Sequence, residues 1–512
     1  MSNENTDLMM LQNNANHEIP TVQTTVEPIR TGTLSRRQTN VNLARVESLR
    51  LTQRSTVGSK AARIPREDWL PFGGEKDYPA YLPDPEKYVI RLSAILAYVT
   101  FVSSFASAIF SSGVVSTPGV TLYVFGFAAG PTFWAPASEF IFTIGTATAK
   151  DVQTIMLTRF FAGLFAASPL SIVPGAFADI FNNRQRGVAI ACFAMAVFVG
   201  PFASPFTGGF IVMSYLGWRW TMYITAIMGF FGTALLLTFF KETYAPMILV
   251  DKAKTLRRQT RNWGIHAKQD EVEVDFKELI TVNFSRPFRM LFTEPIVFLV
   301  TVYMSFIYGL MYALLAAYPV VFQGIHGMNL GVGSLPFIGL IIGELLAGVY
   351  TLLGQPAYTK KLSANGDIPV PEWRMPSAIV GGIAFTIGLF WYGWTGFTQG
   401  IHWMAPTASG VLVGFGIYCI FLNCFNYLID SYLQFAASVF AANTILRSAV
   451  GACFPLFSRQ MFVNLGVQWA GTLLGCLSAI MIPIPLAFII FGPRLRRKSG
   501  FAPQLPVFEE NA

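Results

Sequence analysis

Two long apolar blocks, residues 92–240 and 295–492, limit most strongly what this chain can fold into. Together they contain 347 of the 512 residues but only 10 Lys or Arg and 7 Asp or Glu. A soluble domain usually carries about a quarter charged residues, whereas the whole chain has 12%. Such long apolar stretches indicate burial in a lipid bilayer, and they exclude an ordinary soluble enzyme.

The blocks divide into segments that are long enough to cross a bilayer. A hydrocarbon core of about 30 Å needs about 20 helical residues at a rise of about 1.5 Å each. The first block predicts spans at 92–115, 121–139, 152–178, 187–212 and 219–240. The second block predicts spans at 295–321, 331–353, 376–395, 405–429, 433–457 and 467–491. We therefore expect an all-α membrane protein.

The polar stretches between and beside the blocks hold most of the basic residues. Lys plus Arg total 36, with 12 in residues 1–91, 10 in 241–294 and 4 in 493–512. Basic residues next to apolar spans are typical of the cytoplasmic face, so both termini are expected in the cytoplasm. The expected organisation is a disordered cytoplasmic tail (1–90), an N-terminal transmembrane bundle (91–240), a cytoplasmic linker (241–294), a C-terminal transmembrane bundle (295–492) and a cytoplasmic tail (493–512).

The first block has one span too few for this orientation. Arg184 and Arg186 should also face the cytoplasm, which requires an even number of crossings between the N-terminal tail and these residues. Only three full-length spans precede them. Phe140–Ala149 is apolar but only ten residues long, and as a helix it would cover about 15 Å, half of the hydrocarbon core. We expect either a shortened third span or a loss of residues relative to a working ancestor.

Other kinds of site find no support in the sequence. The five Cys lie in apolar runs without CxxC or His-paired spacing and the four His are scattered, so no metal site is predicted. No GxxxxGK[ST] phosphate loop occurs, which argues against an ATP-driven pump. The net charge of +8 follows from the segments that flank the spans and does not indicate nucleic-acid binding. We expect no cofactor, no catalytic residues and no enzyme activity.

Several short motifs resemble those of a known transporter family. They are Arg159–Gly163, Gly200–Gly209, Trp218–Trp220, Lys241–Tyr244, Pro371–Arg374 and Tyr427–Tyr432. In these motifs, over about residues 70–512, the chain resembles the major facilitator superfamily. Within that family it is similar to the fungal twelve-span drug:proton antiporters, which include multidrug, fluconazole-type and polyamine exporters.

Three features depart from the family pattern. The stretch before the first span lacks the DDPxNPxNW-like sequence, and the first external loop is shortened to Ser116–Gly119. The basic, GRR-like loop between the second and third spans is absent, because Ser138 and Glu139 are followed at once by Phe140. This third departure agrees with the shortened span that charge and length predict, and it puts the activity of the chain in doubt.

The resemblance implies a major facilitator fold of two six-helix bundles, with the third span truncated and the substrate site between the bundles. It implies secondary active transport by alternating access, with proton-coupled efflux of drugs, toxins or polyamine-like solutes. The expected partners are an apolar or cationic organic small molecule, protons and the lipid bilayer. The chain is expected to be a monomer in the plasma membrane, with the vacuolar membrane as the alternative. Two other functions remain open, a nutrient or polyamine facilitator or importer and a non-transporting receptor or degenerate transporter.

The resemblance also assigns roles inside the spans. The antiporter signature comprises Gly200, Pro201, Pro205, Gly208 and Gly209. Its glycines would let another helix approach closely while its prolines bend the span. Ordinary glycine and proline packing within a membrane helix is the alternative interpretation.

Charged side chains inside a span are costly, so those that occur are candidates for function. Arg159, Glu344 and Asp430 are expected to carry proton coupling and charge relay, with Glu344 as the first choice. A static ion pair is the alternative for Arg159, and a position at headgroup level is the alternative for Asp430. For Arg447, as for Arg159, a functional charge and a static ion pair are the two interpretations. No role is assigned to Glu139, because it adjoins the missing loop.

Two kinds of uncharged residue are expected to line the substrate cavity. The side-chain amides of Asn423 and Asn426 need a hydrogen-bond partner or a wet cavity inside a span. The rings of Tyr312 and Phe421 suit a bulky apolar solute, although aromatic packing or contact with lipid is the simpler interpretation for any single ring.

Overall fold

The part of the chain that the structure describes is built of helices. The computed structural model describes residues 85–108, 136–181, 183–239, 245–261, 267, 276–366, 368–432 and 435–499. All of them belong to one compact unit, Lys60–Ala512, and every regular element in these ranges is a helix. Most of the predicted tails, the predicted span 121–139 up to residue 135, and the motif Lys241–Tyr244 lie outside the described residues.

The six predicted spans of the second block each correspond to helical structure. The elements are α11 (Pro295–Tyr318), which continues into a π-type helix η5 (Pro319–Ile325), the short η6 (Val332–Ser334), α12 (Phe337–Ala364), the short η7 (Pro371–Arg374), α13 (Met375–Thr395), α14 (Met404–Ser431), α15 (Ala436–Leu465), α16 (Val467–Met481) and α17 (Pro483–Lys498). The helices extend beyond the predicted spans. A single residue, Gly466, separates α15 from α16, and its φ of +81° is a conformation that glycine adopts without strain.

In the described part of the first block, fewer helices are full-length. Its elements are α3 (Pro85–Ala108), α5 (Pro136–Thr148), α6 (Val152–Ile180), α7 (Asn183–Met213) and α8 (Arg219–Phe239). Two further helices, α9 (Ala245–Thr260) and α10 (Phe276–Thr293), lie between the two blocks. Among the described residues, nine helical segments are long and apolar enough to cross a membrane, three in the first block and six in the second.

Helix α5 contains the last residues of the predicted span 121–139 and most of the short apolar stretch Phe140–Ala149, so one helix covers residues that the sequence assigns to two spans. The part of it that the structure describes starts at Pro136, and these 13 residues cover about 20 Å. The expected break between Glu139 and Phe140 is absent, because α5 runs through both residues. The helix ends before Lys150, and Asp151 then starts α6 by accepting a hydrogen bond from the Thr154 backbone N–H at 2.7 Å. This capping bond also holds the pKa of the Asp151 carboxyl below its usual value.

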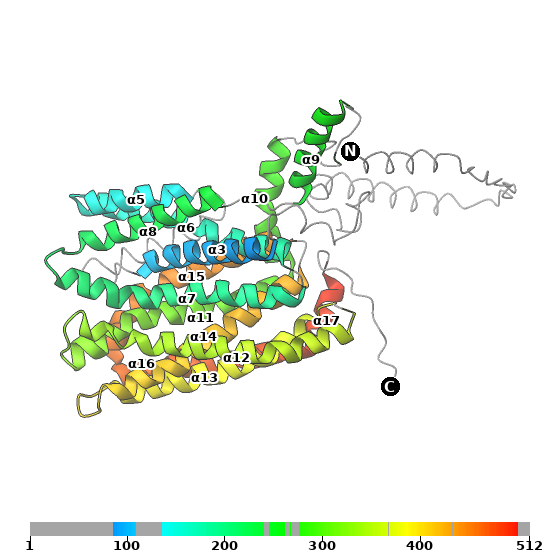
Figure 1. Ribbon diagram of the computed structural model, residues 1–512. Coiled ribbons are helices and arrows are strands. Elements are labelled where there is room, and N and C mark those ends of the chain that lie inside the picture. Colours follow the sequence, from blue (N-terminus) through cyan, green and yellow to red (C-terminus); the bar gives the residue numbers. More distant parts are fainter. Residues whose placement is uncertain are drawn as a thin grey trace, which may run out of the picture. The chain divides into compact units, whose positions relative to one another are not determined.

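Long helices of the two blocks pack side by side, as Figure 1 shows for α7, α11, α14 and α12. Within the second block, α11 packs on α15, and α14 packs on both α12 and α13. Glycines allow the closest of these contacts. A Cβ atom on Gly343 of α12 would lie 2.0 Å from the Val411 carbonyl oxygen of α14, so the two backbones touch there. Across the blocks, α7 packs on α12 and α14, and α6 packs on α15.

Candidate functional site

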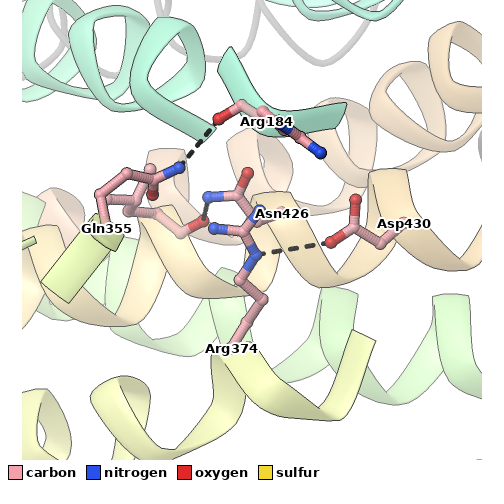
Figure 2. Close-up of polar contacts among 6 residues, drawn as sticks. Arg184, Gln355, Arg374, Asn426 and Asp430 are labelled. Atoms are coloured by element: carbon pink, nitrogen blue, oxygen red, sulfur yellow. Dashed lines mark hydrogen bonds and ion pairs between the residues drawn. The ribbon is translucent and has the colours of Figure 1, made fainter. Parts of the chain in front are cut away.

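Two of the three charged residues predicted from sequence, Glu344 and Asp430, lie near the contact between α7 and the second bundle. One end of this contact carries basic side chains from α7, η7 and α17, and we call it the basic end. There the Gln355 side-chain amide of α12 donates to the Arg184 carbonyl oxygen of α7 at 2.9 Å (Figure 2). Gly187 follows on α7, where a Cβ atom would lie only 3.0 Å from Nη1 of Arg374. Polar contacts therefore tie the two bundles together at this end.

Asp430 is part of the polar cluster at the basic end. Nε of Arg374 lies 3.4 Å from Oδ2 of Asp430 (Figure 2), and the two side chains are only 9% and 4% exposed. The Arg374 guanidinium also stacks on the Tyr358 ring at 3.8 Å, and Arg186 of α7 lies within electrostatic range of Asp430. The sequence singled out Asp430 for proton coupling, whereas here its charge is matched by arginines. Arg374 was visible only as the last residue of the Pro371–Arg374 motif.

A second ion pair joins the end of α17 to η7. Nη1 of Arg496 contacts Oε1 of Glu372, and a Cβ atom on Gly492 would also meet this carboxylate, at 2.6 Å. Glu372 and Asp430 at the basic end are therefore each paired with an arginine. Separating an ion pair that is buried this deeply is costly, because removal of one partner leaves an uncompensated charge.

Glu344 lies deeper in the bundle and has no such partner. Eleven residues separate it from Gln355 on α12, which is about 16 Å along the helix axis. Its side chain is 0% exposed, and neither carboxyl oxygen has a hydrogen-bond partner among the described residues. It lies within electrostatic range of Tyr418 of α14, whose hydroxyl donates to the Ala191 carbonyl oxygen of α7 at 2.9 Å. The carboxyl group predicted to couple protons therefore adjoins a hydrogen bond that crosses from one bundle to the other.

Arg447 of α15 is the second buried charge at this depth. Its side chain is 2% exposed, and its Nε and Nη1 groups have no acceptor among the described residues. The guanidinium carbon lies 4.5 Å from the centre of the Tyr308 ring and 5.8 Å from the centres of the Phe421 and Phe425 rings. Tyr308 donates to the Tyr312 hydroxyl at 3.5 Å. We call Arg447, Tyr308, Tyr312, Phe421 and Phe425 the Arg447 cluster.

The Arg447 cluster reaches the first bundle through its phenylalanines. The Phe421 ring lies 4.6 Å from the Phe198 ring of α7, and the Phe425 ring lies 6.2 Å from the Phe193 ring of α7. The structure thus brings Phe421, predicted to line the cavity, to the contact between the bundles, and places Tyr312 in the same cluster beside Tyr308. The sequence analysis did not place Arg447 among the main candidates, because no sequence spacing relates it to rings on α11 and α14.

Arg159 of α6 donates to backbone and contacts sulfur within the first bundle. It is 0% exposed, its Nη2 donates to the Ala106 carbonyl oxygen of α3 at 3.2 Å, and its Nη1 lies 3.8 Å from the sulfur of Met222 in α8. These contacts join α6, α3 and α8. A charge at the centre of a bilayer costs about 3 kcal/mol on insertion scales, and such contacts offset part of that cost.

The antiporter signature of α7 contacts both bundles. A Cβ atom on Gly200 would lie 2.7 Å from the Phe105 backbone nitrogen of α3, so the two helices touch within the first bundle. At the end opposite to the basic end, a Cβ atom on Gly209 would lie 2.7 Å from the Leu330 carbonyl oxygen. Pro201 and Pro205 lie inside the helix, and Gly208 is buried. The close approach expected of these glycines is present at Gly200 and Gly209.

The two asparagines of α14 each donate one side-chain hydrogen bond to a carbonyl of their own helix. Asn423 donates to the Cys419 carbonyl oxygen at 2.7 Å, and Asn426 donates to the Leu422 carbonyl oxygen at 3.0 Å. An amide inside a span needs a partner, and the preceding helical turn supplies it here. Figure 2 places Asn426 beside Arg374 at the basic end. Contact with a solute stays a prediction for both residues.

No group of three or more metal-binding side chains occurs among the described residues. The five cysteines are unpaired thiols, two of them buried in α14. The chemical groups of this site are therefore the buried charged side chains along the α7 contact. Such a site can bind and release a small molecule or a proton when its helices separate.

Comparison with known proteins identifies the family. The Major Facilitator Superfamily profile matches residues 93–455. The multidrug transporter FLU1 of Candida albicans is 41% identical over 518 residues, which covers 92% of this chain and 85% of that protein. The multidrug transporter TPO1_1 of Candida glabrata is 41% identical over 519 residues, with coverage of 91% and 90%. An uncharacterized transporter of Schizosaccharomyces pombe is 44% identical over 486 residues, with coverage of 86% and 90%.

Solved structures agree at the level of the fold. The proton:xylose symporter XylE, bound to 6-bromo-6-deoxy-D-glucose, aligns with a TM-score of 0.55 at 15% identity and covers 79% of this chain and 96% of its own. The predicted all-α major facilitator fold is therefore confirmed. The helices, the profile and the relatives agree, and the chain belongs to the major facilitator superfamily as a multi-pass membrane transporter.

Proposed function

We propose that this chain exports drug-like organic solutes in exchange for protons, with its basic end in the cytoplasm. The relatives named as multidrug transporters support the direction and the broad substrate class. The observation that carries proton exchange is the isolated carboxyl group of Glu344, buried beside the inter-bundle hydrogen bond of Tyr418. Burial without a partner costs a carboxyl group less free energy when it is protonated and neutral than when it is ionised. Separation of α7 from α12 and α14 would expose it to water and allow the proton to leave.

The contacts at the basic end define what must break in each cycle. The hydrogen bond from Gln355 to the Arg184 carbonyl, and the contact of Arg374 with Gly187, close this end. A solute from the cytoplasm enters only after they separate. Contact at the opposite end, where Gly209 meets Leu330, then has to hold. Such rocking about a central site is the alternating access of this fold.

The proton gradient is sufficient to drive this export. A membrane potential of about 100 mV supplies about 2.3 kcal/mol for each charge that crosses. A tenfold concentration ratio corresponds to about 1.4 kcal/mol, so one proton supports a gradient of about 50-fold. Exchange of one proton for one neutral solute therefore needs no ATP.

A transport assay with Glu344→Gln tests the proposal. The protein is reconstituted into liposomes with an imposed pH gradient, and uptake of a fluorescent drug is followed in both orientations. We expect the variant to lose proton-driven accumulation by about tenfold or more while solute counterflow without a gradient continues. Asp251→Asn on α9 is the matched control, because Asp251 is an exposed acid outside the spans. Full proton-driven accumulation by Glu344→Gln would refute the coupling role.

The absence of a loop after Glu139 favours a second function, that of a membrane protein without transport activity. Phe140 follows Glu139 within one helix, and the ten apolar residues Phe140–Ala149 cover only about 15 Å, half of the hydrocarbon core. The test compares this chain with a version that carries a GRR-containing loop and the remainder of a full-length span between Glu139 and Phe140. Efflux by the restored version alone would show that the chain as it stands is inactive.

Placement of the chain in the plasma membrane, as a monomer with both termini in the cytoplasm, is also part of this proposal. The basic residues at the ends of α12 and α17 support it, because cytoplasmic ends of spans carry an excess of Lys and Arg. Fluorescent tags at both termini, combined with a protease-protection assay, test the orientation. A tag that is digested from outside intact cells would contradict it.

A further inference from the structure

The Arg447 cluster leaves a buried positive charge only partly compensated. Three aromatic rings surround the guanidinium, and ring faces attract a cation. Ring faces do not replace the hydrogen bonds that guanidinium N–H groups require in a buried site. Nε and Nη1 lack an acceptor among the described residues, although the side chain is 98% buried. The cluster therefore presents donors for which the described part of the chain supplies no acceptor.

Other polar atoms beside Arg447 on α15 do not remedy this. Asn443, one helical turn earlier, donates to the Thr301 hydroxyl at 3.3 Å, while its own side-chain oxygen lacks a donor. The neighbouring Ser448 hydroxyl also lacks a partner. No ion pair to Arg447 is present among the described residues, in contrast to Arg374 and Arg496 at the basic end. The missing group is an acceptor, and a negatively charged one would best match the site.

Glu344 and Arg447 differ in how the cost of burying their charge can be avoided. A carboxyl group becomes neutral when it takes a proton, whereas a guanidinium stays charged in proteins. Only an acceptor from outside the cluster can therefore complete the surroundings of Arg447. A cationic solute would meet an arginine that already occupies the ring faces, and the two positive charges would repel each other.

We infer that the Arg447 cluster binds the carboxylate end of an apolar or aromatic organic acid. This inference rests on the proposed function and narrows its substrate class to organic anions at this position. The carboxylate would accept from Nε or Nη1 of Arg447, and the body of the solute would lie against Phe421 and Phe198. These two rings come from opposite bundles, so the solute would contact both sides of the interface that separates during transport.

Three solutes of the same shape test the charge preference. They are 2-naphthoate, 2-naphthamide and 2-naphthylmethylammonium, titrated by calorimetry into the purified full-length chain in detergent at pH 7. We expect the carboxylate to bind at least about tenfold more tightly than the amide and the amine. Equal affinity for the three solutes, or tighter binding of the amine, would overturn the inference.

Substitutions locate the binding and separate it from proton exchange. Arg447→Gln should lower the affinity for 2-naphthoate about tenfold while the amide binds as before, and Arg447→Lys should fall in between. Arg459→Gln is the matched control, an exposed arginine on the same helix, and it should leave all three affinities unchanged. Undiminished binding of 2-naphthoate by Arg447→Gln would overturn the inference.

The two proposals can fail independently, because calorimetry on detergent-solubilised protein involves no proton gradient. Loss of the preference for 2-naphthoate refutes the inference alone, and full proton-driven accumulation by Glu344→Gln refutes the coupling role alone. If Arg447→Gln fails to fold, as judged by size-exclusion chromatography, the preference of the unmodified chain among the three solutes still decides.

Discussion

The contact between α7 and the second bundle has two regions whose buried charges differ. At the basic end, two buried acids pair with arginines, Asp430 with Arg374 and Glu372 with Arg496. About 16 Å deeper, Glu344 has no hydrogen-bond partner among the described residues, and the same holds for Nε and Nη1 of Arg447. The membrane-embedded region thus holds its charges uncompensated, and the region near the helix ends holds them paired.

This difference separates groups that keep a contact closed from groups whose partners change. A buried ion pair strongly opposes removal of either member. An isolated buried charge has no such constraint, and it gains when a proton or a ligand arrives. We therefore propose the deeper region as the place where the structure responds to protons and solutes. The following substitutions test this contrast by measuring the free energy of unfolding.

Asp430→Asn should cause the largest loss of stability. It leaves the Arg374 guanidinium buried without its counter-charge, and such a change costs about 3–5 kcal/mol. Chemical denaturation of the purified protein in detergent, followed by tryptophan fluorescence, measures the difference. A cost well under 1 kcal/mol would show that the pair at the basic end is no more important than a surface contact.

The chain contains a matched control for this experiment. Lys254 and Asp251 on α9 form a pair with the same 3.4 Å separation, but their side chains are 55% and 70% exposed. Asp251→Asn should cost less than about 1 kcal/mol, because water screens an exposed pair. The double variant Asp430→Asn, Arg374→Gln should recover part of the lost stability, since no unpaired charge remains.

Glu344→Gln is the same chemical change as Asp430→Asn, but the expected sign differs. No counter-charge loses its partner, and the amide removes any cost of a buried carboxylate. The free energy of unfolding should stay within about 0.5 kcal/mol of the unmodified value or rise. A loss comparable to that of Asp430→Asn would mean that Glu344 has a hidden partner, and the contrast between the two regions would fail.

Sequence could predict most of the helices because they follow from composition and length. A span needs a certain number of apolar residues, and Phe140–Ala149 is too short to provide them. The resemblance to the major facilitator superfamily then supplied the arrangement of the bundles. The register of helix ends was less predictable, since α15 continues to Leu465 through residues that hydropathy left in a loop.

Side-chain partners could not be predicted, because hydropathy does not define how a helix is rotated about its axis. Asp430 and Arg374 are 56 residues apart, and Tyr418 and Ala191 are 227 apart. The sequence marked Asp430 as a proton carrier, yet its pairing with Arg374 depends on how η7 meets α14. By contrast, Asn426 needed an acceptor inside a span, and a carbonyl four residues earlier was always within reach.

Tyr418→Phe should affect stability far less than Asp430→Asn does, and it tests whether the two bundles are coupled through this side chain. It removes one hydrogen bond across the bundles, from the Tyr418 hydroxyl to the Ala191 carbonyl, worth about 1 kcal/mol. Because this bond must break when α7 separates from α14, solute counterflow should become faster. Tyr350→Phe, at an exposed tyrosine on α12, is the control.

If Tyr418 responds to the protonation of Glu344, the effects of Tyr418→Phe and Glu344→Gln on counterflow will not add. Additive effects would show that the hydroxyl and the carboxyl group act independently, despite their proximity.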